Sequence, residues 1–188
     1  MRTTTLPILT ATLMLSIAHP AASAATPTEA TDVSKADLEL LTTLPGPSPD
    51  HVARVVDVGK LNVVVAIVHR GPTHDKPGDL PDGDSHDQIT EVYHIVSGSG
   101  TLTTGGTLVD QRRWPADSDV VREMVGPSWR GKIRGGHARK VSAGDVVIIP
   151  PGVLHGWQHI DKEVTYVSIR PDPDRVLQAG YINPALRK

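Results

Sequence analysis

Short runs of β-branched residues, each closed by glycine or proline, constrain the fold of this 188-residue chain more than any other feature. The runs at 60–70 (KLNVVVAIVHR), 89–98 (ITEVYHIVSG) and 163–171 (EVTYVSIRP) have the length and the valine and isoleucine content of β-strands. Gly-Gly at 105–106 and Pro-Pro-Gly at 150–152 are typical of the tight turns between such strands. About eight strands at this close spacing predict an all-β sandwich or barrel.

One short helix is predicted before the strands. Ser34 followed by Asp37 resembles a helix N-cap with an acid in the first turn. The run at 36–44 (ADLELLTTL) then favours a helix as far as the proline-rich stretch at 45–49. The segment 111–136 has no apolar periodicity, and we expect an insertion with little regular structure there. Because the chain has no Phe, we expect its core to consist of Val, Ile and Leu.

The N-terminal residues have the features of a secretory signal peptide. Arg2 supplies a positive charge, an apolar stretch follows, and Ala22-Ser23-Ala24 is a small-residue cleavage site. The apolar stretch is too short, and too interrupted by Thr and Pro, for a membrane span. We therefore expect cleavage after Ala24 and a secreted or periplasmic mature protein with no membrane contact. The expected organisation is a signal peptide (1–24), a leader with the short helix (25–49) and one domain (50–188).

Charge and cysteine content exclude several classes of function. The formal net charge of −2 argues against a nucleic-acid-binding protein, which needs a clear basic excess. The absence of cysteine excludes disulfides, thiolate metal ligands and cysteine nucleophiles. Any metal ion must therefore bind through imidazole and carboxylate groups.

Two candidate ligands lie around the start of the predicted strand at 89–98. Side chains alternate between the two faces of a strand, so Glu91 and Tyr93 share one face and His94 lies on the other. Glu91 can then point into a barrel, while His86 reaches the same place from the loop before the strand. We expect His94 to be a structural residue packed beneath the sheet.

A third ligand has to come from a distant part of the chain. His155 is the candidate, because the Pro-Pro-Gly turn at 150–152 brings the chain back beside the preceding strand. Three protein groups are the usual minimum for a catalytic first-row metal, with further positions left open for water or substrate.

These residues fall in two motifs that resemble those of the cupin superfamily. The first cupin motif has Gly, His-x-His, Glu and Gly, and this chain has its spacing at Gly78, Asp84, His86, Glu91 and Gly98. The spacing of the second motif is present at Gly144, Pro150, Gly152, His155 and His159. The resemblance implies a small jelly-roll β-barrel with one metal ion inside, bound by His86, Glu91 and His155.

The chain departs from the family pattern at two positions. Asp84 stands where the motif has its first His, and its carboxylate can either bind the metal through oxygen or remain solvated in an Asp-rich loop. His69 and His74 are the alternatives for that further ligand. His159 replaces an Asn that is not a metal ligand in the family, so we expect His159 to line the pocket and to transfer protons.

Other side chains are candidates for contact with a substrate. Tyr93 is either a proton donor in the pocket or a core aromatic residue with a satisfied hydroxyl. Trp157 shares a strand face with His155 and either lines the cavity or packs in the core. The segment 111–140 holds eight Lys and Arg against three acids. It is either a solvated face or a cover over the barrel mouth that favours an anionic substrate.

The resemblance implies a metal-dependent enzyme that acts on a small organic substrate, an acidic one if the basic segment covers the mouth. Two histidines and one carboxylate suit non-haem iron, so oxygenase chemistry with iron is favoured, and manganese or zinc is the alternative. An isomerase or lyase, or a non-catalytic module that binds a small molecule or a metal, remains open because a fold hosts many functions. Related barrels often pair through their sheets, and the resemblance therefore implies a homodimer.

Overall fold

The computed structural model describes residues 28–76 and 78–187, so the predicted signal peptide (1–24) lies outside the described residues. The helical segments are α1 (Lys35–Thr42), the π-helix η1 (Val120–Met124) and the 3-10 helix η2 (Pro184–Leu186). The strands are β1 (Asp50–Asp57), β2 (Asn62–Arg70), β3 (Asp82–His86), β4 (Glu91–Thr104), β5 (Thr107–Arg113), β6 (Ser128–Arg134), β7 (His137–Ser142), β8 (Val146–Ile149), β9 (His155–His159) and β10 (Val164–Asp172).

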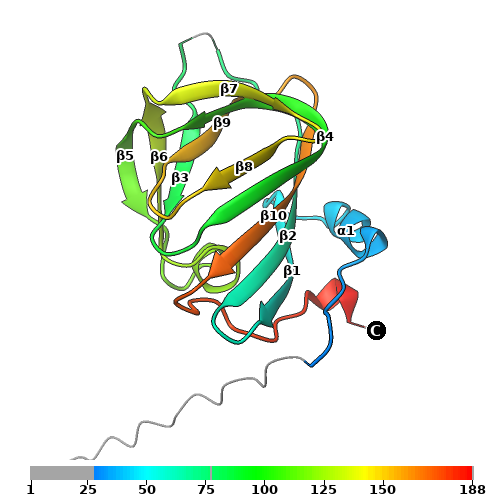
Figure 1. Cartoon of the computed structure of the whole chain (residues 1–188). Helices are drawn as coiled ribbons and strands as arrows, with labels where there is room; N and C mark the ends of the chain where they lie inside the picture. Colours follow the sequence, from blue (N-terminus) through cyan, green and yellow to red (C-terminus); the bar gives the residue numbers. More distant parts are fainter. Residues whose placement is uncertain (1–27, 77, 188) are drawn as a thin grey trace, which may run out of the picture.

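The strands form two antiparallel sheets that share the long strand β4 and close into a barrel (Figure 1). One sheet has the order β1-β2-β10-β4-β8, and the other has the order β7-β4-β9-β3-β6-β5. The first half of β4 pairs with β10 and β8, whereas its second half pairs with β7 and β9. The predicted all-β jelly-roll barrel is confirmed.

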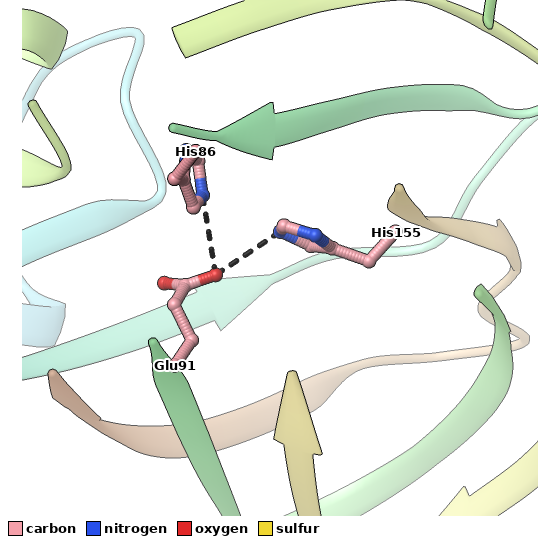
Figure 2. Close-up of side chains that lie close together, drawn as sticks. All are labelled: His86, Glu91 and His155. Atoms are coloured by element: carbon pink, nitrogen blue, oxygen red, sulfur yellow. Dashed lines mark ion pairs between the residues drawn. The ribbon is translucent and has the colours of Figure 1, made fainter. Parts of the chain in front are cut away.

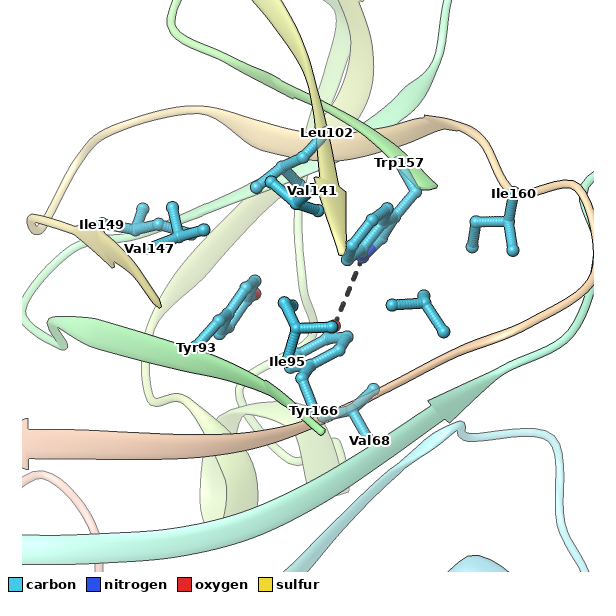
Figure 3. Packing of buried hydrophobic residues seen from close by; sticks show 11 residues of the cluster. Val68, Tyr93, Ile95, Leu102, Val141, Val147, Ile149, Trp157, Ile160 and Tyr166 are labelled. Atoms are coloured by element: carbon cyan, nitrogen blue, oxygen red, sulfur yellow. Dashed lines mark hydrogen bonds between the residues drawn. The ribbon is translucent and has the colours of Figure 1, made fainter. Parts of the chain in front are cut away.

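The barrel interior is filled by side chains from the inward-facing positions of both sheets (Figure 3). Aliphatic residues such as Ile95 and Leu102 are completely buried there, as expected for a chain without Phe. Aromatic side chains also contribute, since the rings of Tyr93 and Tyr166 lie 4.3 Å apart and Trp157 lies 5.7 Å from Tyr166. The expectation of a purely aliphatic core was therefore incomplete.

Helix α1 packs on the outside of the barrel, against β1 and β2 (Figure 1). The predicted N-cap is confirmed and forms a full capping box, because the Asp37 amide donates to Ser34 Oγ (3.1 Å) and the Ser34 amide donates to Asp37 Oδ2 (3.0 Å). Leu41 anchors the helix and is fully buried with Ala53 and Ile67. Among the described residues, no helix is both long enough and apolar enough to span a membrane.

The segment 111–136 is more regular than the sequence predicted. It contains the end of β5, the π-helix η1 and all of β6, which pairs with β3 on one side and β5 on the other. The expectation of an irregular insertion was wrong because these strands lack the apolar alternation on which it depended. Backbone pairing holds them, and the Arg113 guanidinium stacks 4.5 Å from the centre of the Trp129 ring.

Candidate metal site

Three buried side chains meet inside the barrel at the ends of three strands (Figure 2). His86 ends β3, Glu91 begins β4 and His155 begins β9. Glu91 Oε2 lies 3.3 Å from His86 Nε2 and 3.0 Å from His155 Nε2. Their ligand atoms all lie within 4.8 Å of one another, which is close enough for one metal ion to be bound by all three.

The outer nitrogens of both imidazole rings are already hydrogen-bonded. The Ser128 hydroxyl donates to the carbonyl of Gly126 (2.8 Å), so its oxygen accepts from His86 Nδ1–H at 2.8 Å. His155 Nδ1–H donates to the carbonyl of Val153 at 3.0 Å, in the turn before β9. Each ring therefore carries its proton on Nδ1, and each Nε2 faces Glu91 with a lone pair when the ring is neutral.

Glu91 is held by donors on both of its oxygens. Oε1 accepts from Arg170 Nε at 2.9 Å and from Ser168 Oγ at 3.2 Å. Oε2 accepts from the Tyr93 hydroxyl at 2.8 Å. Arg170 is 1% exposed and also donates to the carbonyl of Met124 and to the carboxylate of Asp50. The carboxylate is therefore oriented from behind, with Oε2 directed at the two histidines.

The charges in this cluster shift the protonation of its members. Burial opposes ionisation of Glu91, but the charges of Arg170 and His86 and the imidazole hydrogen bonds outweigh it and hold the pKa of Glu91 well below its usual range. Burial also opposes the charge on His155, yet the hydrogen bond and charge of Glu91 raise the pKa of His155 above its ordinary value. Burial and the neighbouring carboxylate raise the pKa of the Tyr93 hydroxyl, which therefore keeps its proton.

A cavity of about 510 Å³ reaches this cluster, and its volume suits a small organic molecule. Trp114 and Met124 line one part of the cavity, and Trp157 and Tyr166 line another. Tyr93 and Trp157 line this cavity and also belong to the buried core cluster, so the two alternatives left open for each residue apply together.

Asp84 also lines the cavity, but it is not among the three clustered ligands. One of its oxygens, Oδ1, accepts a hydrogen bond from the Trp114 indole at 2.8 Å. The two alternative ligands are elsewhere: His69 Nδ1 is hydrogen-bonded to Thr165 Oγ1 at 2.8 Å, and His74 is exposed in the loop after β2.

His159 does not reach the cavity, contrary to expectation, because the strand that carries it has a bulge. Leu102 pairs with Trp157 and Thr101 pairs with His159, so Gln158 is an extra residue in β9. The bulge reverses the alternation of side chains, and His159 is exposed. His94 lies on the face opposite Glu91, as predicted, but it is exposed rather than packed beneath the sheet.

Within the described part of the chain, the eight basic residues of 111–140 do not line the cavity at the metal cluster. Arg113 pairs with Asp87, Lys132 pairs with Asp82, and the Arg130 guanidinium stacks 4.0 Å from the centre of the Trp114 ring. The argument for an anionic substrate that depended on this segment is therefore lost.

The sequence interpretation missed Ser168 and Arg170, which hold Glu91 from β10. The sequence did contain a pattern that could have identified them, because both residues share a strand face with Val164 and Tyr166, which are fully buried core residues. An Arg on the inward face of a strand requires a buried acidic partner. Only the pairing of β10 with β4, which places Ser168 opposite Tyr93, identifies that partner as Glu91.

The two sequence motifs thus converge on one point inside a two-sheet barrel. His86 and Glu91 come from the first motif and His155 comes from the second, although 64 residues separate Glu91 from His155 in the sequence. The chain folds into the jelly-roll barrel that the resemblance to the cupin superfamily implied, and the three residues named from the two motifs meet inside it.

Comparison with known proteins gives structural matches only. No protein-family model matches the sequence, and no curated protein matches it. A protein with a double-stranded β-helix domain from Klebsiella pneumoniae is 16% identical, with a TM-score of 0.43 over 78% of this chain and 93% of that chain. A cupin protein from Bacteroides fragilis is 19% identical, with a TM-score of 0.36 over 67% of this chain and 78% of that chain.

An enzyme is also among the similar structures. The DMSP lyase DddQ from Ruegeria pomeroyi is 14% identical, with a TM-score of 0.37 over 65% of this chain and 45% of that chain. These similarities concern the fold, and the chemistry of the site rests on the chain's own residues.

Proposed function

We propose that this chain is a cupin and a metal-dependent enzyme whose ion is bound by His86, Glu91 and His155. One observation carries the proposal. Hydrogen bonds hold the ring protons of His86 and His155 on Nδ1, which leaves both Nε2 atoms facing Glu91. Glu91 Oε2 lies 3.3 Å from His86 Nε2 and 3.0 Å from His155 Nε2. When the rings are neutral, lone pairs at these distances repel one another unless a cation lies between them. A divalent metal ion satisfies all three groups together, whereas protonation of a ring satisfies only one contact.

Oxygenase-type chemistry with iron is the favoured reaction class. A bound divalent ion would polarise a carbonyl or carboxylate oxygen of the substrate, and an iron ion with two histidines and one carboxylate would also activate dioxygen. Manganese or zinc in the same ligands would favour an isomerase or lyase instead.

The chain's own residues have distinct tasks in such a reaction. Tyr93 keeps its proton at neutral pH and lies 2.8 Å from the Glu91 oxygen that faces the histidines. Because a hydroxyl with a raised pKa is a weak acid, Tyr93 is the candidate to donate a hydrogen bond, without transfer of its proton, to a substrate oxygen bound beside Glu91. Trp157 and Tyr166 supply an aromatic wall that orients an organic substrate and excludes water. Arg170 keeps Glu91 ionised and in place.

Oxygen uptake by the loaded protein tests the reaction class. The mature chain is loaded anaerobically with iron(II), manganese(II) or zinc(II) and is then mixed with air-saturated buffer and a panel of small carbonyl and carboxylate compounds. Substrate-dependent oxygen consumption by the iron form alone supports the oxygenase. Turnover without oxygen consumption supports an isomerase or lyase, and binding without turnover of any compound supports a non-catalytic module.

Export to the periplasm or beyond is also part of the proposal, and it is supported by the signal-peptide features of residues 1–24. Mass spectrometry of the protein recovered from the secreted or periplasmic fraction tests it. A mature N-terminus at Ala25 is expected, and a chain that keeps Met1 in the cytoplasm contradicts it.

We further propose a homodimer formed through the outer face of the sheet at β4 and β8. Val92 in β4 pairs with Ile148 in β8 on one side and with Ile169 in β10 on the other, so the three apolar side chains form a row on that face. Ile148 is 68% exposed and Val146 is 55% exposed, and large exposed apolar side chains next to one another are typical of interfaces. Light scattering should give a dimer mass, and Ile148→Lys should give a monomer. A monomeric wild-type protein contradicts the proposal.

A further inference from the structure

The two oxygens of Glu91 have different hydrogen-bond partners, and this difference determines how many of the two oxygens can bind an ion. Oε2 faces both histidine Nε2 atoms, whereas Oε1 accepts from Arg170 Nε and Ser168 Oγ. We infer that Arg170 is a positioning residue that restricts Glu91 to a single ligand oxygen, and that it thereby sets how many positions on the ion stay open. The inference rests on the proposed metal site.

Arg170 is itself fixed, so it cannot follow Glu91 into a different arrangement. Its guanidinium donates to the Met124 carbonyl at 3.1 Å and to the Asp50 carboxylate, and only 1% of the residue is exposed. These partners belong to the end of η1 and the start of β1. Binding an ion through both oxygens would require Glu91 to give up one of the hydrogen bonds that Oε1 accepts, and the bond from Arg170 is a charge-assisted one between two buried side chains.

Tyr93 acts on the other oxygen and does not oppose single-oxygen binding. Its hydroxyl donates to Oε2, which as a carboxylate oxygen has a second lone pair for an ion. Each oxygen is therefore assigned: Oε1 to the guanidinium, and Oε2 to the tyrosine and the ion. No other acid is among the clustered ligands of the described residues, so this assignment decides the number of oxygen donors.

The number of open positions determines which substrates the site accepts. An ion that prefers six ligands keeps three positions free when it is bound by two imidazoles and one carboxylate oxygen. It keeps only two when both oxygens of Glu91 bind. Three free positions admit a substrate that chelates through two oxygens together with a second small molecule. Arg170 therefore favours chelating substrates, such as α-hydroxy or α-keto acids or vicinal diols, in a reaction with a second reactant.

Counting the exchangeable waters on the bound ion tests this role. The full mature chain is loaded with manganese(II), and water-oxygen-17 relaxation counts the waters on the ion in the wild type and in variants. Arg170→Met leaves Oε1 with the Ser168 hydroxyl as its one remaining donor, so that Oε1 can also bind the ion, and the variant should carry one water fewer than the wild type. Arg170→Lys keeps a cationic donor and should restore the wild-type count. Arg175→Met is the matched control, because it removes a guanidinium whose carboxylate partner is Asp57 and not Glu91, and it should leave the count unchanged.

The outcomes separate this inference from the proposed function. A wild-type count in Arg170→Met overturns the positioning role and leaves the metal site intact. If that variant does not fold, Asp50→Asn with Arg170→Met removes the unpaired acid together with the guanidinium, and it should show the same loss of one water. A wild-type chain that binds no manganese(II) overturns the metal site and the inference with it.

Discussion

Replacing Glu91 by Gln is expected to weaken the fold even when no metal is present. Glu91 is 2% exposed and accepts hydrogen bonds from Arg170, Ser168 and Tyr93. Gln keeps the shape of the side chain but removes the negative charge that faces the buried guanidinium. Arg170 would then have Asp50 as its only carboxylate partner. The amide group of Gln would also place its own N–H donors against the donors that now serve the carboxylate.

The size of the loss follows from the burial of both partners. Removing one member of a buried ion pair costs about 3 to 5 kcal/mol, and the remaining Asp50 partner places this case near about 3 kcal/mol. For a chain of this length, each kcal/mol shifts the melting temperature by about 2 to 4 °C, so we expect a decrease of about 6 to 12 °C. His155→Ala leaves the Glu91–Arg170 pair intact and should lower the melting temperature by much less.

The assay is thermal and urea unfolding of the mature protein in the presence of a chelator. The account predicts that Glu91→Gln is clearly less stable than His86→Ala and His155→Ala, although all three lose the same metal site. The reasoning about the buried pair is refuted if Glu91→Gln melts within about 2 °C of the wild type, which corresponds to less than about 1 kcal/mol.

Three further results are expected. In the metal-free protein, the raised pKa of His155 means that its pairing with Glu91 stabilises the fold below about pH 6.5 and is lost as the pH rises through the raised pKa. The metal-loaded protein should instead become more stable as the pH rises, because protons compete with the metal for Nε2. Melting temperatures measured across pH, once with a chelator and once with bound metal, test both dependences. Asp84→Asn should leave the metal dissociation constant within about a factor of two, or ~0.4 kcal/mol, by calorimetry. Tyr93→Phe should retain the metal and slow turnover by about 100-fold, whereas the exposed His159 can be replaced by Ala without effect on turnover.

Local sequence patterns were sufficient to predict the strand that carries the site. Strict alternation placed Glu91 and Tyr93 on the inner face of β4 and His94 on the outer face, and the structure agrees. Motif spacing brought His155 to the same point, although no local pattern connects it with Glu91. These successes depend on regular strands and on turns that glycine and proline specify in the sequence.

The same reasoning was wrong where the geometry is irregular or long-range. The bulge at Gln158 reverses the face of His159, and a bulge arises from pairing with β4 that the sequence of β9 does not reveal. Strand β6 has no apolar alternation that the sequence could reveal. It is stabilised by backbone pairing and by stacking of Arg on Trp, and not by a buried apolar face. The role of Arg170 becomes visible only when β10 lies beside β4.

Metal content tests the central claim most directly. The purified mature protein is incubated separately with iron(II), manganese(II) and zinc(II), freed of excess metal, and measured by elemental analysis beside His86→Ala, Glu91→Gln and His155→Ala. The account predicts one tightly bound ion per wild-type chain and loss of that ion in each of the three variants. A wild-type protein that stays metal-free with every ion, or three variants that keep full occupancy, would contradict the claim that these residues form a metal site.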